Sequence, residues 1–464
     1  MKKTKLLIIV ALVTCMVLNA CGTSGPMEKN PPMSENYPME PENPKDDVKS
    51  PDGSETYPGE SSDAAQIGED ARGNAAYVSN PQAADADLED QGEDINEFAV
   101  KLYQKLAEEE GNLIFSPYSI FQAFLMTYAG ANAETKAEIA KTLDIDLDDG
   151  DMVHQWMNAL NLRLTTRPEF ADPEAQPLEF NVANALWAQQ GEHFEQAFLD
   201  KLAANYDAGL KLVDFANAED ARQLINLWVA AQTNDKIKNL IPEGVLSEMT
   251  RLVITNAVYF KGAWQHQFDA QFTNRQSFTK LDGSQTETDM MHTAFNGSGF
   301  VSESYQAVRL PYEQSGFSMA LIMPKGDFKA FENSLSEDVL DDVLKALSNQ
   351  AMINLSMPKF KTESSFGLAD TLKQLGMKSA FDKDSADFSG ITGNKDLYIS
   401  GVVHKAFIDV NEEGTEAAAA TAAMMNTTSL PAESYELVFD HPFIYVIYDQ
   451  MTGTIVFMGR VVAP

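Results

Sequence analysis

The stretch that decides the fold is Leu252-Val253-Ile254-Thr255-Asn256-Ala257-Val258-Tyr259-Phe260, an almost unbroken run of apolar and β-prone residues. It lacks the alternation of polar and apolar side chains that marks a strand with one face in water. We therefore predict a β-strand that is buried on both faces, inside a sheet that other layers cover.

Helices are expected mainly before this strand and further strands after it. From about residue 91, apolar residues recur at helical spacing through Leu106, and Gly111 supplies a C-cap. Further helices are predicted over 122–128, 134–143, 152–164, 195–205 and 218–235, and further strands over 319–323, 353–357, 402–410, 443–448 and 454–461, with a hairpin loop at 449–453. About 373 residues without an internal repeat or linker indicate a single large α+β domain over residues 92–464.

The N-terminus has the pattern of an export signal. Lys2, Lys3 and Lys5 precede an apolar run over residues 6–18 that is too short for a comfortable transmembrane helix. The sequence Leu-Asn-Ala-Cys that ends at Cys21 resembles a bacterial lipobox, in which the cysteine is lipidated and becomes the first mature residue. We therefore expect a lipoprotein signal peptide over residues 1–20; the alternative is an ordinary signal peptide with a chance cysteine.

Residues 21–91 are expected to form a disordered, acidic, proline-rich linker. Residues 22–91 hold nine of the 20 prolines, and 16 acidic against four basic side chains give them a net charge of −12. Such a composition cannot bury enough apolar surface to offset the entropy of ordering the chain. A charged, proline-rich linker is extended, so the folded domain is expected to stand away from the lipid.

The charge and the cysteines exclude several classes of protein. The net charge of −35, from 34 basic and 69 acidic residues, disfavours nucleic acid, heparin-like polyanions and anionic membrane surfaces as partners. The two cysteines, Cys15 and Cys21, both lie at the N-terminus, so we predict neither a disulfide framework nor a zinc site built on cysteine. We expect contact with a membrane only through the lipid anchor.

The motifs of common enzymes are absent from the sequence. There is no Gly-x-Ser-x-Gly elbow, no His-Glu-x-x-His and no Gly-x-x-x-x-Gly-Lys-Ser/Thr. The six histidines are scattered along the chain, and a single histidine is more often a satisfied structural residue than a base or a metal ligand. We therefore predict that the protein is not an enzyme and that it has no metal site and no cofactor.

The most unusual segment is residues 412–431, EEGTEAAAATAAMMNTTSLP. By propensity alone it is a short exposed helix, because alanine is the best helix former, Thr415 can cap it and Glu416 sits in its first turn. In the absence of other information this helix is the preferred interpretation.

A resemblance changes that interpretation. The residues EEGTEAAAAT at 412–421 resemble the proximal hinge of an inhibitory serpin, and a reactive loop of suitable length follows them. Other segments similar to serpins occur in the family's order: NLIFSPYSI at 112–120, TNAVYFKGAW at 255–264, VHKAF at 403–407, DHPFI at 440–444 and FMGRVV at 457–462. The resemblance covers the chain from about residue 93 to 464 and implies three β-sheets, about nine helices and an exposed reactive centre loop.

The resemblance also implies that the loop inserts into the main sheet after cleavage, and the residues are compatible with this. Side chains that would face the core in an inserted strand alternate along the loop and are all small or apolar: Thr415, Ala417, Ala419, Thr421, Ala423 and Met425. Glu416 falls on the opposite set, which we expect to face solvent. The expected hinge consists of Glu412, Glu413, Gly414, Thr415, Glu416, Ala417, Ala418, Ala419, Ala420 and Thr421.

The expected reactive bond joins Thr428 and Ser429, since the family places the cleaved bond about 14 residues beyond the hinge glycine. Thr427 and Met425 are the alternative positions. A threonine at the cleaved position suits serine proteases with small apolar S1 pockets, so elastase-like or subtilisin-like targets are expected.

By resemblance, two further groups of residues govern opening of the main sheet. Ser116, Ser119, Asn256 and His404 match the polar cluster below the sheet that is called the shutter. Trp264, Lys359 and Glu412 match the entry region that is called the breach, where a contact between Lys359 and Glu412 would tie neighbouring strands. Without the family, each residue has a plain structural interpretation as a satisfied buried polar group, a core aromatic or a solvated charge.

The resemblance thus implies an irreversible suicide inhibitor of serine proteases, monomeric and without a cofactor. Together with the signal sequence, it places the protein on the extracellular side of a bacterial membrane, lipid-anchored or secreted. The alternative is a non-inhibitory serpin that acts as a binding or carrier module, although a loop that never inserts has no need of the small residues in the hinge. The sequence does not identify the natural protease.

Overall fold

The computed structural model describes residues 69–166, 178–313, 315–416 and 433–464, and the structural statements below refer to these ranges. Ten α-helices lie within them: α1 (Asp85–Leu106), α2 (Pro117–Tyr128), α3 (Ala133–Leu143), α4 (Met152–Thr165), α5 (Gln196–Tyr206), α6 (Ala218–Gln232), α7 (Phe328–Ser334), α8 (Glu337–Ala346), α9 (Ala369–Leu375) and α10 (Ser389–Thr392). None of these helices is long and apolar enough to cross a bilayer.

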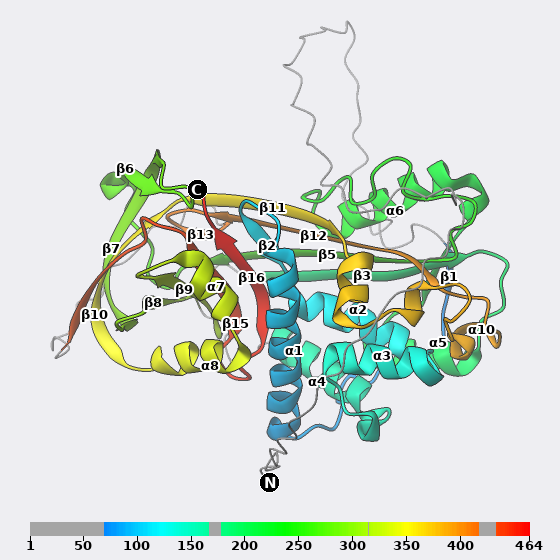
Figure 1. The fold of residues 1–464 in the computed structure, drawn as a ribbon. Helices are drawn as coiled ribbons and strands as arrows, with labels where there is room; N and C mark the ends of the chain where they lie inside the picture. The colour runs from blue at the N-terminus through cyan, green and yellow to red at the C-terminus, as the bar shows by residue number, and fades with distance from the viewer. Residues whose placement is uncertain (1–68, 167–177, 314, 417–432) are drawn as a thin grey trace, which may run out of the picture. The chain divides into compact units, whose positions relative to one another are not determined.

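The main sheet has seven strands, and Figure 1 shows its long strands running side by side through the body. In spatial order they are β1 (Glu69–Ala71), β4 (Leu210–Val213), β3 (Glu179–Gln189), β5 (Leu252–Ala263), β13 (Gly414–Thr415), β12 (Ile399–Val410) and β11 (Phe360–Gly367). Strand β5 contains the apolar run at residues 252–260. Eleven of its 12 residues are buried, so the prediction of a strand covered on both faces is confirmed.

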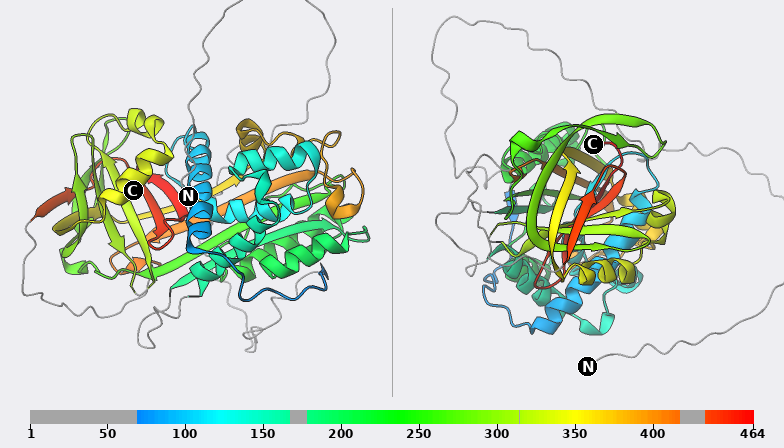
Figure 2. Two further views of the ribbon diagram at one scale, coloured as in Figure 1. Left: turned by 90° about the horizontal axis from the view of Figure 1, so that it is seen from below. Right: turned by 90° about the vertical axis from the view of Figure 1, so that its left-hand side faces the viewer.

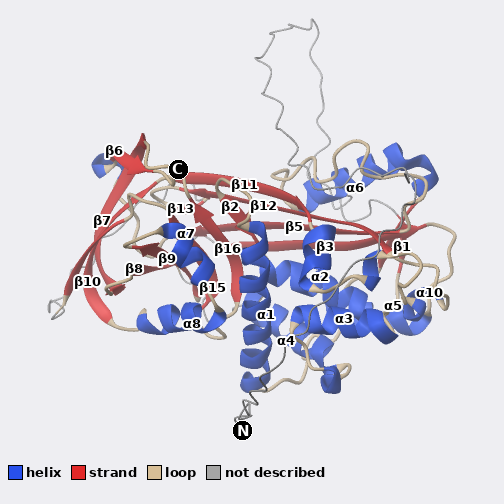
Figure 3. Cartoon of the chain, viewed as in Figure 1, coloured by secondary structure: helices blue, strands red, loops and turns tan. Residues whose placement is uncertain are grey.

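Helices cover both faces of this sheet. Figures 1 and 3 show α6 on one face and the group from α2 to α5 on the other. On the α6 face, the rings of Trp228 and Trp187 pack edge to face, with centroids 5.5 Å apart. Both belong to a small hydrophobic core that is separate from the main one. On the other face, all 12 residues of α2 are buried. A helix that is apolar all round can only be stable in such an interior position.

A nine-stranded sheet packs beside the first, and the right-hand view of Figure 2 looks onto it. Its path is β14 (Ser434–Val438), β10 (Gln350–Pro358), β7 (Gln285–Val301), β8 (Tyr305–Pro311), β9 (Phe317–Pro324), β15 (Phe443–Asp449), β16 (Ile455–Val461) and β2 (Leu113–Phe115), with β6 (Asn274–Thr279) on β7. We expected three sheets, but the hydrogen bonds between strands of the described residues define two. The reason is β7, whose 17 residues pair with β6 and β10 along most of their length and with β8 at the end.

The α+β class and the elements predicted from periodicity are confirmed. The predicted helices correspond to α1 to α6, and α6 ends at Gln232 rather than at residue 235. The predicted hairpin loop joins β15 to β16, with Gly453 at a φ of 73°. Strands β3 and β4 precede β5 and were not predicted, because β3 carries polar residues such as Asn181 and Asn184 among its apolar ones.

The prediction that the linker extends to residue 91 is wrong. Strand β1 pairs antiparallel with β4 from Glu69 to Ala71, and α1 begins at Asp85 rather than near residue 91. The segment before α1 has few large apolar side chains, as the linker does, so its composition does not distinguish it from the linker. It is ordered by contacts with distant residues, which composition does not reveal.

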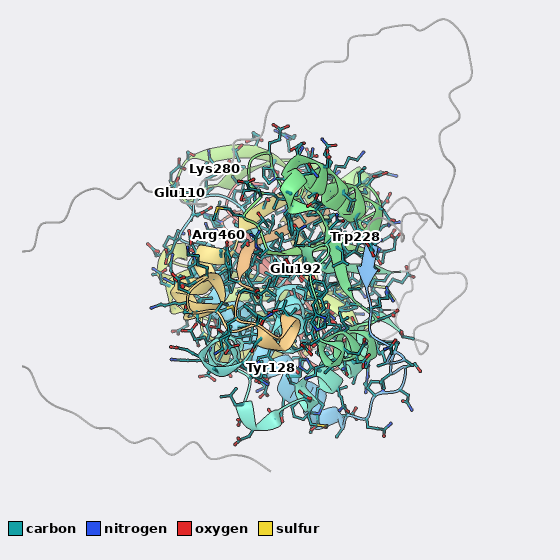
Figure 4. The ribbon with its side chains drawn as sticks, turned by 90° about the vertical axis from the view of Figure 1, so that its right-hand side faces the viewer. Glu110, Tyr128, Glu192, Trp228, Lys280 and Arg460 are labelled. Atoms are coloured by element: carbon teal, nitrogen blue, oxygen red, sulfur yellow. The ribbon has the colours of Figure 1, made fainter. Side chains whose placement is uncertain are left out.

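These contacts fix residues 69–84 to the edge of the main sheet and to two helices. The Asp70 carboxylate lies 2.7 Å from Nζ of Lys211 on β4, and that ammonium group lies 5.5 Å from the ring centroid of Trp228. Figure 4 labels Trp228 and shows β1 in blue beside it. The Tyr77 hydroxyl donates to Asn158 of α4 at 2.8 Å, and the Val78 amide donates to the Ala204 carbonyl of α5 at 2.9 Å.

We predict that removal of residues 68–78, in a chain that already lacks residues 1–67, destabilises the folded body. A chain that begins at residue 79 loses the β1–β4 ladder, the Asp70–Lys211 pair and the Tyr77 hydrogen bond. Its free energy of unfolding should be lower by about 1–3 kcal/mol than that of a chain that begins at residue 68. Urea unfolding followed by circular dichroism measures the difference, and equal midpoints for the two chains would contradict the prediction.

Candidate functional site

The candidate site is the end of the main sheet where the hinge enters it. Gly414 pairs with Ala263 of β5 and Thr415 with Gly262 of β5, while Thr415 also pairs with Val410 of β12, all antiparallel. Further along, β5 and β12 pair directly and in parallel, through seven residue pairs from Leu252↔Ile399 to Val258↔Ala406. The two strands therefore separate at one end, and the two-residue strand β13 lies between them.

A tight turn made by Asn411 sends the chain back into the sheet. Its side-chain oxygen accepts from the amides of Glu413 and Gly414 at 2.9 and 3.2 Å, and its own amide donates to the Gly414 carbonyl at 3.0 Å. Gly414 must be glycine, because a Cβ atom there would lie 2.1 Å from the Gly262 carbonyl oxygen. Asn411 was not predicted as a site residue, although asparagine is favoured in turns of this kind.

The structure brings the three expected breach residues together. Nζ of Lys359 lies 2.7 Å from Oε1 of Glu412, and the Thr273 hydroxyl donates to the same oxygen at 2.7 Å. Burial raises the pKa of Glu412, but the hydrogen bonds from Lys359 and Thr273 outweigh burial and hold that pKa below its usual value. The Trp264 indole donates to the Asn411 carbonyl at 3.0 Å, and the backbone amide of Trp264 donates to the Glu413 carbonyl at 2.9 Å.

Thr415 is fully buried against aromatic residues. Its hydroxyl lies 2.8 Å from the hydroxyl of Tyr312, whose ring stacks on Trp264 with centroids 4.6 Å apart. Burial raises the pKa of Tyr312, so this phenol stays protonated and can hydrogen-bond to Thr415. The orientation of Thr415 agrees with the inward-facing set of the predicted strand. Tyr312 was missed because it follows β8, far from the hinge in sequence.

The expectation that Glu416 faces solvent in an inserted strand stays a prediction, because the strand ends at Thr415 in this structure and Glu416 is buried outside it. The Glu416 side chain is 7% exposed, and its carboxylate lies 3.0 Å from Nζ of Lys236. The residue also leaves the strand conformation, with a φ of 51° in the left-handed region that residues with a Cβ atom rarely adopt. The strand alternation therefore ends at Thr415 in this structure, and the charge of Glu416 is met by a partner that the sequence did not indicate.

The four expected shutter residues form one buried network below the seam between β5 and β12. The Ser119 hydroxyl donates to Oδ1 of Asn256 at 2.8 Å, and Nδ1 of His404 contacts the same oxygen. The Ser116 amide donates to Nε2 of His404 at 3.2 Å, and the Ser116 side chain caps α2. Since Nε2 accepts a hydrogen bond, the ring proton of neutral His404 is on Nδ1 and is donated to Asn256.

Asn184 completes this network and was missed by the sequence analysis. It lies beside Asn256 in the β3–β5 register, and His404 lies beside Asn256 in the β12–β5 register. The Asn256 amide donates to Oδ1 of Asn184, and the Asn184 amide donates to the Ser119 carbonyl at 2.9 Å. Three adjacent strands thus present polar side chains at one level above the N-terminus of α2. The sequence does not specify strand register, so the alignment of Asn184 with Asn256 and His404 could not be predicted.

Several predicted residues lie outside the described residues: Ala417, Ala418, Ala419, Ala420 and Thr421 of the hinge, Thr428 and Ser429 of the reactive bond, and Cys21. Within the ranges that the structure describes, no group of three or more His, Cys, Asp or Glu side chains is arranged to hold a metal ion.

Comparisons with known proteins agree with this geometry. The family model described as Serpin (serine protease inhibitor) matches residues 93–464. The uncharacterized serpin-like protein TK1782 of Thermococcus kodakarensis is 40% identical over 374 residues, which cover 80% of this chain and 85% of that protein. Leukocyte elastase inhibitor A of Rattus norvegicus is 35% identical over 379 residues, which cover 79% of this chain and 97% of the relative.

Solved structures give the same result. The native state of tengpin, a thermophilic serpin, has a TM-score of 0.73 at 26% identity and covers 84% of this chain and 97% of that chain. Thyroxine-binding globulin in complex with thyroxine has a TM-score of 0.70 at 29% identity and covers 80% of this chain and 99% of that chain. The predicted fold class is thus confirmed.

We predict that the buried histidines make the fold sensitive to acid. Burial lowers the pKa of His404 to about 3, and burial likewise lowers the pKa of His154 to about 3. In the unfolded chain each takes up a proton near its ordinary pKa of 6.5, so their contribution is complete above that pH. It is lost as the pH falls from about 6.5 towards 3, with an upper limit on the order of 5 kcal/mol per histidine.

The measurement is the free energy of unfolding in urea between about pH 7 and pH 5, where the slope counts bound protons. The variant His404→Gln should give a shallower slope than the parent protein, whatever its stability at neutral pH. His193→Gln, at an exposed position, is the matched control and should leave the slope unchanged. An unchanged slope in His404→Gln would refute the assignment of a neutral buried His404.

Proposed function

Because the chain belongs to the serpin family, whose model covers residues 93–464, we propose that it is an irreversible inhibitor of serine proteases. Members of this family are generally protease inhibitors rather than enzymes. The observation that carries the proposal is the position of β13 between β5 and β12, since it places the start of the loop where an inserting strand would begin.

The proposed reaction begins with a protease that treats the loop as a substrate. The serine hydroxyl of the protease attacks the carbonyl carbon of Thr428, and the bond to the nitrogen of Ser429 breaks. The new amino group leaves with a proton, and the protease stays attached to Thr428 through an ester. Cleavage frees the chain behind Thr428 to extend β13 between β5 and β12 before water hydrolyses the ester.

Insertion requires the seam between β5 and β12 to open. The seven residue pairs of that seam must separate, and the contacts of Asn256 with His404 lie across it. An added strand then hydrogen-bonds to both neighbours. About ten new backbone bonds at about 0.5–1.5 kcal/mol each, with several buried methyl-sized groups at about 0.8 kcal/mol each, provide a driving force on the order of 10 kcal/mol. The intact molecule is therefore proposed to be kinetically trapped.

The proposed targets are elastase-like or subtilisin-like proteases. Threonine is small enough for a shallow apolar S1 pocket and lacks the charge that a trypsin-like pocket binds. One relative, from rat, is named Leukocyte elastase inhibitor A, which supports the same class. We propose that the protein acts as a monomer and without a cofactor.

We also propose that the protein is anchored outside the cell through lipid on Cys21. The described chain starts at Glu69, in β1, which pairs with the part of β4 that lies beside the Leu252 end of the main sheet. The hinge enters at the Ala263 end. A tether that reaches the body at β1 would leave the loop at the opposite end of the sheet, accessible to a protease in solution.

We predict a covalent complex with elastase or subtilisin that survives a denaturing gel. Mass spectrometry of the released peptide should place the cut between Thr428 and Ser429. Thr415→Arg should abolish the complex and leave a cleaved protein, because Thr415 is fully buried beside Tyr312 and an unpaired charge there opposes insertion. Glu433→Arg, which also introduces an arginine but reverses a charge at an exposed position beyond the loop, is the control and should still form the complex.

Two outcomes distinguish the alternatives. Clean cleavage or no reaction in the parent protein would favour a non-inhibitory binding or carrier module. A complex that persists in Thr415→Arg would refute insertion as the mechanism, provided that circular dichroism shows the variant to be folded.

We predict that Cys21 carries lipid when the full chain is produced in a bacterial host. The protein should partition into detergent and incorporate labelled fatty acid, and Cys21→Ser should lose the label and appear in the medium or the soluble extract. Equal labelling of Cys21→Ser would contradict lipidation at this cysteine.

A further inference from the structure

Strand β13 ends at Thr415, although the pairing between β5 and β12 leaves space for a longer strand between them. Thr415 is the last residue of β13, and the direct pairing of β5 with β12 begins only at Val258 and Ala406. Between these points, residues 259–261 of β5 and 407–409 of β12 do not pair with each other. The antiparallel register places residue 416 between Lys261 and Asp409, so three more residues could enter without breaking a β5–β12 pair.

The hinge leaves the sheet at Glu416. Its amide still donates to the Asp409 carbonyl at 2.9 Å, as an inserted residue would. Its φ of 51° departs from the strand conformation and lies in a region that is unfavourable for a residue with a Cβ atom. A strained conformation at this one position needs a compensating interaction.

That interaction involves Lys236 and Tyr259. The Glu416 carboxylate lies 3.0 Å from Nζ of Lys236, and Nζ lies 5.9 Å from the ring centroid of Tyr259 on β5. Burial raises the pKa of Tyr259, and the nearby Glu416 carboxylate adds to the increase. The carboxylate therefore lies beside a cation and a phenol on the face of the sheet that α6 covers.

Lys236 is held in place by the turn that ends α6. Asn234 and Asp235 adopt φ values of 49° and 60°, and the Lys236 amide donates to the Thr233 carbonyl at 2.9 Å. The next residue, Ile237, is 1% exposed, and its amide donates to the Thr233 hydroxyl at 3.2 Å. The backbone at Lys236 is thus fixed on both sides, which makes it a firm attachment point for the hinge.

We infer that the ion pair between Glu416 and Lys236 limits how far the hinge enters the main sheet, so that β13 ends at Thr415. Lys236 acts as a positioning residue. The inference deepens the proposed function, since it concerns the resting depth of the same loop. With the pair in place, Glu416 keeps its turned conformation and β13 ends at Thr415. Without the pair, Glu416 relaxes to an extended conformation, and the hinge advances into the three unpaired positions.

The direct test is hydrogen–deuterium exchange of the full chain in Lys236→Gln and Glu416→Gln. Advance of the hinge adds a strand beside 259–261 and 407–409, so peptides covering these residues should exchange several-fold more slowly than in the parent protein. Lys238→Gln removes a neighbouring exposed charge from the same segment and should show parental exchange. The charge-reversed double variant Lys236→Glu with Glu416→Lys should also return towards parental exchange.

The other outcomes overturn the inference. Unchanged exchange at these peptides in both variants would show that the pair does not set the depth of the hinge. Faster exchange at residues 262–263 and at Val410 would show that the hinge leaves the sheet, so that the pair retains it rather than stops it. Neither result depends on a protease.

A second measurement relates the ion pair between Glu416 and Lys236 to protease inhibition. The rate constant for formation of the covalent complex should rise several-fold in Lys236→Gln, because part of the insertion is then complete before cleavage. It should remain parental in Lys238→Gln. If the parent protein forms no complex at all, the proposed function fails, while the exchange data still decide the role of the ion pair.

Discussion

The structure depends on the incomplete pairing of two central strands. Strands β5 and β12 pair in parallel from Leu252↔Ile399 to Val258↔Ala406 and then separate, and two hinge residues lie between them at the other end. A backbone donor or acceptor inside a sheet must be paired or solvated, so a gap in a sheet is a place where an added strand gains stability. The hinge uses part of this gap, and the rest is the basis of the proposed insertion.

Polar networks at two levels of the same sheet hold the gap in its present state. At the seam, Asn184, Asn256 and His404 present side chains from three adjacent strands to Ser119 at the N-terminus of α2. At the entry end, Lys359 and Thr273 hold the Glu412 carboxylate on one side of the hinge turn. Buried polar groups are costly unless every partner is present, so these networks favour one arrangement of the strands over small displacements.

The aromatic residues give the entry end its shape. Tyr312 follows β8 of the nine-stranded sheet, stacks on Trp264 and meets the hydroxyl of Thr415. The ring of Phe260 meets Tyr312 edge to face at 4.8 Å, so the end of β5 is packed against the second sheet. The contact explains why Thr415 is small and polar: a larger residue would not fit below the gap, and an apolar one would leave the Tyr312 hydroxyl without this partner.

Local sequence determined the helices up to α6, several of the long strands and the residue types of the site. The apolar run at residues 252–260 specifies a buried strand, the periodicity before it specifies helices, and the small residues after Gly414 permit a strand that enters a crowded sheet. Only the tertiary structure decided which residues meet. The segment at residues 69–84 is ordered by β4, α4 and α5, and the charge of Glu416 is met by Lys236, which lies beyond the end of α6. Hydrogen bonds and ion pairs between elements depend on register and packing, which no local pattern of residues contains.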